Sequence, residues 1–335
     1  MSAPAETRAA VVESPRGART MKLVALAIVV IVLMVLAAYA KRSEVYLLTL
    51  YCVYLMATMG LNLTVGYAGQ MSLGHAAFLG IGAYIGAIAM KAGIPFLLVL
   101  PMAALACFAL GLALGFPALR VQHHYLAFAT LGFNVLVFLV MRNEEAITGG
   151  TFGISGIPRP HILVDLSGHL AFFYFTLASL LLVGFAMWWI LRSPWGRAFA
   201  ALRDNPIRAE SLGINITAYT LLAFAIGAAC AGIAGVYYAS LVEFIEPGPF
   251  HFSTSLLMLL AVIIGGSGRF FGPVVGTVII ILLPELLRSS ALPWLKFMQT
   301  WYLAVFGLAV VVLMIWLPGG LLSIPDRLRH RRIPK

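Results

Sequence analysis

Residues 193–239 read SPWGRAFAALRDNPIRAESLGINITAYTLLAFAIGAACAGIAGVYYA and place a charged segment directly before a long apolar one. The charged part carries Arg197, Arg203 and Arg208, and because an arginine in lipid is costly, this part lies in water. The apolar part, expected to be helical over 217–240, is long enough to cross a bilayer core of roughly 30 Å. The stretch therefore predicts a membrane protein with an ordered segment outside the bilayer.

The composition extends this interpretation to the whole chain. Its 335 residues are 62% hydrophobic and only 10% charged, with a mean hydropathy of +0.99. About ten spans of roughly 20 residues would use most of such a chain. We therefore predict an all-α polytopic membrane protein of about ten transmembrane helices, some short or broken. The expected helices are 23–40, 45–65, 73–90, 95–118, 125–141, 169–191, 217–240, 256–267, 273–288 and 299–317.

Charged residues divide unevenly between the two sides of this protein. If residues 1–22 are cytoplasmic, that side holds 15 of the 22 Lys and Arg and 5 of the 12 Asp and Glu, which leaves 7 of each (22 − 15 and 12 − 5) for the other side. Basic loops resist translocation, so both termini are expected in the cytoplasm. We predict a polar tail at 1–22, a transmembrane domain at 23–317 with a cytoplasmic loop at 192–216, and a basic tail at 318–335.

The first apolar run has two interpretations. Residues 23–40 follow a basic tail and end in Ala38-Tyr39-Ala40, as the cleavage site of a signal peptide does. A run of this length exceeds the usual apolar region of a signal peptide, which favours an uncleaved first helix.

The polar segment contains start and stop signals for two short helices. Ser193-Pro194 supplies an N-cap and a first-turn proline, and Pro206 disfavours helical geometry at the residue before it, so the first helix ends near Asp204. Asn205-Pro206 starts a second helix, which Gly213 terminates. A helix over 206–212 is too short to be stable alone in water, so we expect it to dock against a partner.

The glycine-rich stretch VIIGGSGRFFGPVVG, residues 262–276, predicts either a kink in one long span or a hairpin between two short ones. Arg269 favours the hairpin, because an arginine at the bilayer centre costs at least about 2.5–3.5 kcal/mol. The glycines Gly265 and Gly266 are interpreted either as the wall of a gate or as close helix packing through small residues.

The chain lacks the residues that several classes of function require. The chain has no phosphate-binding loop, no nucleophile with a base and no metal-ligand spacing, and its basic residues are scattered rather than clustered as nucleic acid would require. Cys52, Cys107 and Cys230 are isolated within apolar runs and are expected to be packing residues. Glu285 is the single acidic residue expected within a span, which disfavours an ion-coupled carrier, although Na⁺ sites built from carbonyls and hydroxyls stay open.

Four segments resemble a known family in the same order. They are GLNLTVGYAGQMSLGHAAFLGIGAY at 60–84, TGGTFGISGIPRP at 148–160, the segment at 193–239, and GGSGRFFGPVVGTVIIILLPELLR at 265–288. Together they resemble the permeases of ATP-binding-cassette (ABC) importers of the branched-chain amino-acid type, over roughly residues 45–325. A self-contained secondary transporter or channel for a small neutral or zwitterionic solute is the alternative.

The resemblance implies a permease of a bacterial inner membrane that works with partners. These are a homologous second permease, two cytoplasmic ATPase subunits that bind ATP and Mg, and a periplasmic solute-binding protein, while the chain itself binds no cofactor and no nucleic acid. The short helix would be a coupling helix seated in a groove of an ATPase subunit. Its coupling residues would be Arg203, Asp204, Pro206, Arg208, Glu210 and Gly213.

A translocation pathway is assigned to residues where an inner turn enters the third helix and to the glycine pair of the later turn. These residues are Gly66, Gln70, Ser72, His75, Gly265 and Gly266. The polar ones either line a cavity or cap the third helix. None of the motifs decides the solute, and the resemblance implies a branched-chain amino acid, urea, a short amide or another small polar solute.

Overall fold

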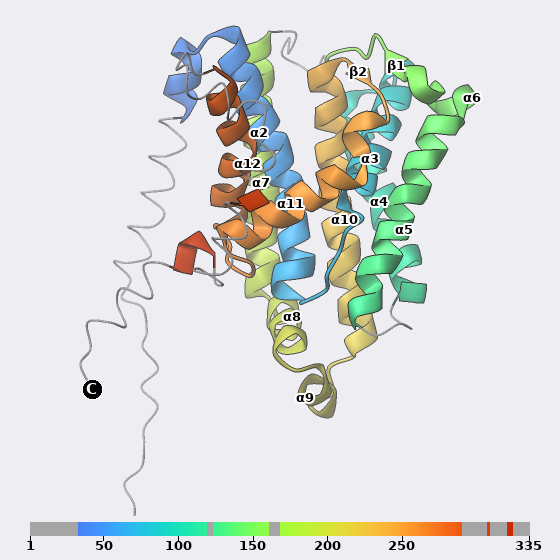
Figure 1. Ribbon diagram of the computed structural model, residues 1–335, viewed down its shortest axis with the longest axis vertical. Coiled ribbons are helices and arrows are strands. Elements are labelled where there is room, and N and C mark those ends of the chain that lie inside the picture. The colour runs from blue at the N-terminus through green and yellow to red at the C-terminus, as the bar shows by residue number, and fades with distance from the viewer. Residues whose placement is uncertain (1–32, 119–122, 161–167, 290–306, 309–319, 324–335) are drawn as a thin grey trace, which may run out of the picture.

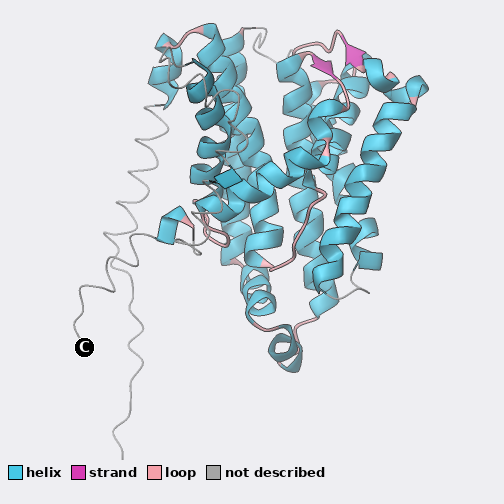
Figure 2. Cartoon of the chain, viewed as in Figure 1, coloured by secondary structure: helices cyan, strands magenta, loops and turns pink. Residues whose placement is uncertain are grey.

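The computed structural model describes residues 33–118, 123–160, 168–289, 307–308 and 320–323, and helices make up most of them (Figures 1 and 2). The predicted tail at 1–22, most of the helix at 23–40 and nearly all of the helix at 299–317 lie outside the described residues. So do most of the tail at 318–335 and the side chains of Glu285 and Arg288.

The described helices follow the predicted ones closely. They are α2 Arg42–Leu61, the π-helix η1 Asn62–Tyr67, α3 His75–Lys91, α4 Phe96–Ala118, α5 His123–Asn143, α6 Glu145–Thr148, α7 His169–Arg192, α8 Pro194–Asp204, α9 Pro206–Ser211, α10 Ile216–Val242, α11 Phe252–Gly265 and α12 Gly272–Ser289. Short 3₁₀ turns lie at η2 Gly150–Phe152, η3 Gly248–Phe250 and η4 Leu321–Ser323.

Five of these helical segments are long and apolar enough to cross a bilayer. They are Arg42–Tyr67, Phe96–Phe116, Leu126–Asn143, His169–Arg192 and Ile216–Val242. Three shorter apolar helices accompany them, at His75–Lys91, Phe252–Gly265 and Gly272–Ile281. The protein is thus an all-α membrane protein, and the total of ten helices stays a prediction.

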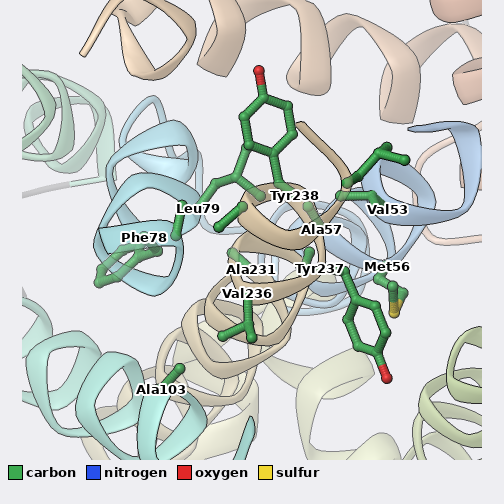
Figure 3. Packing of buried hydrophobic residues seen from close by; sticks show 14 of the residues in the cluster. Val53, Met56, Ala57, Phe78, Leu79, Ala103, Ala231, Val236, Tyr237 and Tyr238 are labelled. Carbon is green, nitrogen blue, oxygen red and sulfur yellow. The ribbon is translucent and has the colours of Figure 1, made fainter. Parts of the chain in front are cut away.

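Helix α10 forms the centre of the bundle and packs against α2, α3 and α4. Its residues Val236, Tyr237 and Tyr238 lie among side chains that the other three helices contribute, such as Met56 of α2 and Phe78 of α3 (Figure 3). Such contacts require helices to approach closely, because packing rather than water exclusion drives helix association in lipid. Cys52, Cys107 and Cys230 are buried free thiols, as predicted.

Small residues set the distance between α10 and its neighbours. A Cβ on Gly60 of α2 would come within 2.6 Å of the carbonyl oxygen of Gly227, and a Cβ on Gly232 would come within 2.9 Å of Cys107 Cβ. Larger side chains at these positions would push α10 away from α2 and α4.

The stretch at 262–276 forms a hairpin, as Arg269 had indicated. Helix α11 ends at Gly265, a turn follows, and α12 begins at Gly272 and packs against α11. Gly266 has a φ of 119°, which L side chains rarely adopt, so the sharp turn depends on this glycine.

The two ends of the bundle differ in construction. At the upper end of Figure 1, the strands β1 Ile154–Ser155 and β2 Phe244–Ile245 pair antiparallel and join the loop after α5 to the loop after α10. Residues 154–155 and 244–245 thus lie at the end of the bundle where α3 ends, whereas Ser255 bonds to Ala76 at the start of α3. Helices α8 and α9 lie at the opposite, lower end (Figure 1).

Candidate coupling segment and its link to the spans

Helix α8 is an amphipathic helix that is anchored to the bundle. Ser193 Oγ accepts a hydrogen bond from Trp195 N at 3.1 Å and Pro194 occupies the first turn, which confirms the predicted start. Phe199 is fully buried among residues of η1, α7 and α10, including Leu63, Met187 and Ala223. The helix ends at Asp204, as expected from Pro206.

Helix α9 is the short helix predicted for residues 206–212, and it covers Pro206–Ser211. Asn205 Oδ1 accepts a hydrogen bond from Arg208 N at 3.0 Å, and Pro206 is in the first turn. At the other end, Gly213 has a φ of 83°, Gly213 N donates to the Glu210 carbonyl, and Ile214 N donates to the Ala209 carbonyl. This pair of bonds is a Schellman motif, so α9 is capped at both ends.

The outer surface of α9 carries apolar side chains that the sequence analysis missed. Ile207 and Leu212 are each 79% exposed, whereas Ala209 is buried and holds the helix against its neighbours. Arg208 and Glu210 are exposed as well. The available signal was the presence of two large aliphatic residues in a charged segment too short to bury both.

Arg203, predicted as a contact to an ATPase, is an exposed residue whose guanidinium group reaches the membrane-spanning bundle. Its Nη1 donates a hydrogen bond of 2.6 Å to the carbonyl oxygen of Gly66 in η1. A Cβ on Gly69 would lie 3.3 Å from Arg203 Cα, so the turn after η1 also packs against α8. Its neighbour Asp204 is exposed.

Asn62, which sequence reasoning did not single out, joins η1 to the hairpin turn. Its Oδ1 accepts a hydrogen bond from Gly268 N, and its Nδ2 donates one to the Arg269 carbonyl, both at 3.0 Å. The Asn62 side chain is buried, and both its acceptor and its donor group are used. Gly66, predicted in a pathway, lies where the two turns touch, because a Cβ there would collide with Gly268 N.

Gln70, Ser72 and His75 are all buried, but they do not cap α3. Instead, Ser255 Oγ of α11 accepts from Ala76 N in the first turn at 2.8 Å, and Thr130 Oγ1 of α5 accepts from Leu73 N, just before the N-cap Gly74, at 2.9 Å. The capping interpretation of Gln70, Ser72 and His75 is therefore wrong, since residues distant in sequence occupy the donors.

The pathway interpretation of these residues stays a prediction. Ser72 Oγ and His75 Nε2 are buried without a hydrogen-bond partner among the described residues, while Gln70 Nε2 donates to the Ala68 carbonyl at 3.3 Å. Gly265 and Gly266 lie in close backbone packing: a Cβ on Gly265 would meet Gly272, and Gly320 approaches Gly266. For these two glycines the contacts agree with the packing interpretation.

A small pocket lies between α2, η1, α7 and the hairpin turn. Asn62, Tyr67, Met187 and Phe270 are among its lining residues, and none of the six predicted pathway residues is.

The family model for the branched-chain amino acid transport system permease component matches residues 43–315 of the chain. The chain belongs to this permease family. Apart from Arg42, the matched range contains all five described spans as well as α8 and α9, so the resemblance carried by the four sequence segments is confirmed.

Named relatives agree with the family. The permease is 35% identical over 311 residues to the high-affinity branched-chain amino acid transport system permease protein LivM of Salmonella typhimurium and to that of Escherichia coli, covering 85% of this chain and 71% of each relative. It is 26% identical over 306 residues to the autoinducer 2 import system permease protein LsrC of Escherichia coli, covering 86% of this chain and 84% of that relative. No solved structure matches the permease.

Proposed function

We propose that this permease is the membrane-spanning subunit of an ABC importer and that α9 docks into a separate ATPase subunit. The observation that carries the proposal is the surface of α9. Two exposed aliphatic side chains, Ile207 and Leu212, stand on a helix that is capped at both ends and is fixed to the bundle through α8. Exposed aliphatic groups beside charged ones are typical of a surface that a protein partner covers.

The partners follow from the family and from what the chain lacks. The chain carries no phosphate-binding loop, so ATP and Mg are bound by two cytoplasmic ATPase subunits. A homologous second permease completes the membrane part, and a periplasmic binding protein delivers the solute. The protein lies in a bacterial inner membrane with 1–22, 192–216 and 318–335 in the cytoplasm, because basic residues concentrate there.

The proposed solutes are branched-chain amino acids or related small polar molecules. LivM relatives at 35% identity are named for branched-chain amino acid transport, whereas the LsrC relative, at 26% identity, is named for autoinducer 2 import. Transport is tested in proteoliposomes that contain the full complex, with leucine, isoleucine, valine and urea offered at the outer side. Uptake should require enclosed ATP, and uptake driven by an ion gradient without ATP would favour a self-contained carrier.

The docking surface is tested by placing a charge on it. Ile207→Glu should reduce co-purification of the ATPase subunit by about tenfold or more, since 1.4 kcal/mol at an interface corresponds to tenfold in affinity. The matched control is Ile147→Glu, which changes an isoleucine that is 63% exposed on α6, at the opposite end. Equal retention of the ATPase by both variants would refute docking through α9.

The orientation is tested with single cysteines in a background without other cysteines. Ser211→Cys on α9 and Ser155→Cys on β1 change exposed residues at opposite ends of the bundle. An impermeant thiol reagent should label Ser155→Cys from the periplasm and Ser211→Cys from the cytoplasm only. Labelling of both from one side contradicts the topology.

A further inference from the structure

Hydrogen bonds on both sides of η1 connect α8 to the hairpin of α11 and α12. Arg203 of α8 donates to the Gly66 carbonyl of η1. Asn62, at the start of η1, binds Gly268 and Arg269 in the hairpin turn. Arg269 Nη1 in turn donates to the carbonyl of Leu322 in η4. Four segments that are far apart in sequence are joined in this way.

The first link is a strong hydrogen bond. A guanidinium donor makes a charge-assisted hydrogen bond, which is roughly twice as strong as a bond between neutral groups. Gly66 lies in η1, a π-helix, where backbone pairing differs from that of an α-helix, and such segments occur frequently at functional sites. The bond thus connects the outermost anchored helix to an irregular part of a span.

The second link uses the donor and the acceptor group of one buried side chain. Asn62 is buried, so each of its two bonds that is broken would leave an unpaired polar group away from water. Both partners are backbone groups of adjacent residues. Asn62 therefore fixes the position of the main chain of the turn.

The hairpin turn is in direct contact with η1 and with the Arg203 side chain, so no space is left between them. A Cβ on Gly268 would lie 2.7 Å from the Gly66 carbonyl oxygen and would also collide with the Arg203 guanidinium. A displacement of α8 therefore acts directly on the hairpin turn and is not absorbed by a gap. The packing of Phe199 beside Leu63 of η1 supports the same connection on its apolar side.

We propose that Arg203 and Asn62 are positioning residues that transmit the movement of the coupling segment to the α11–α12 hairpin. The proposal rests on the proposed function, since it requires an ATPase docked on α9. Neither residue is proposed to touch the ATPase or the solute in this role. Loss of either link should leave the ATPase bound and active while less solute is moved for each ATP.

The test uses the complete complex, purified and reconstituted, with Arg203→Gln, Asn62→Ala and the double variant. Three quantities are measured: retention of the ATPase subunit, the rate of ATP hydrolysis, and the amount of solute transported per ATP. Each single variant should retain the ATPase and lower solute per ATP by on the order of tenfold, within the usual range of coupling between sites. The double variant should be no worse than the worse single one, because both residues serve one connection.

Control variants separate this role from general damage. Arg197→Gln removes an exposed arginine from the same helix and should leave solute per ATP unchanged. Arg203→Lys keeps a positive donor and should recover part of the lost transport. If Arg203→Gln does not fold, Arg203→Lys replaces it in the test. Thermal unfolding of each variant reports on folding, and a loss of transport that only follows loss of folded protein would overturn the proposal.

The outcomes distinguish this inference from the proposed function. If Ile207→Glu releases the ATPase but Arg203→Gln and Asn62→Ala transport like the wild type, docking through α9 stands and the transmission route is wrong. If no ATPase accompanies the wild-type permease, the proposed function itself fails. Additive losses in the double variant would mean that the two residues act separately, which contradicts the route.

Discussion

Helices α8 and α9 are adjacent in sequence, yet they relate to the bundle in opposite ways. Helix α8 buries Ala198, Phe199 and Leu202, and its Arg203 bonds to a span. Helix α9 buries only Ala209 and exposes Ile207 and Leu212. The difference shows that α8 anchors the polar segment to the bundle, while α9 exposes a surface that a partner can contact. Substitutions of the buried residues of α8 should therefore act on folding, and substitutions of the exposed residues of α9 on association.

Phe199→Ala should have the largest effect on stability. Removing a fully buried phenylalanine should lower the free energy of unfolding by about 3–5 kcal/mol, through lost burial and the cavity left behind. Thermal and denaturant unfolding of the purified permease measure the change. Phe185→Ala on α7, where the ring is 62% exposed, is the control and should cost far less. Equal losses at the two positions would show that α8 is not an anchor.

Gly213→Val should have the next largest effect on stability. A β-branched residue at a φ of 83° is strained, and holding a residue in such a region costs on the order of 1–3 kcal/mol. The strain should fray α9, so ATPase retention should fall together with stability. Gly213→Asn is the matched comparison, because asparagine tolerates this conformation, and it should retain most of both. Wild-type behaviour of the valine variant would argue against a rigid end to α9.

Asn205→Ala removes the N-cap of α9 and should cost about 1 kcal/mol in helix stability. Hydrogen exchange of the amides of residues 206–211 should quicken, while exchange within α10 stays unchanged. Asn205→Asp keeps an acceptor for Arg208 N and serves as the control. If the alanine and aspartate variants exchange alike, the cap does not hold the helix.

Glu210→Arg should change stability least, within about 0.5 kcal/mol, because the residue is exposed. Charge reversal at an interface can still cost several kcal/mol, so retention of the ATPase should fall at least about tenfold. Glu145→Arg, an exposed change on α6 at the opposite end, should leave retention intact. Normal retention and transport in Glu210→Arg would place this residue outside the docking surface.

Local signals were sufficient for much of this region. Ser193, Asn205 and Gly213 were predictable because each acts on backbone groups within about three residues, and the structure confirms all three. The hairpin of α11 and α12 was predictable because an arginine and a row of glycines do not suit the middle of one long span.

The contacts that link segments were not predictable in this way. Thr130 and Ser255 bind backbone N–H groups around the start of α3 from 57 and 179 residues away, so nothing near His75 reveals them. Arg203 is exposed, and nothing near it in the sequence reveals its bond to Gly66, which lies more than 130 residues earlier. Asn62 lay unnoticed within an apolar run, since its two partners belong to a turn more than 200 residues later.

The way in which Asn62 holds the hairpin turn also bears on how such a joint can change over evolution. Its partners are an amide and a carbonyl of the main chain, and every residue apart from proline supplies both. Side chains of the turn, such as those of Ser267 and Phe271, can therefore be exchanged without altering these two bonds. The two bonds of Asn62 would stay the same while the surrounding side chains change to suit another solute or another lipid environment.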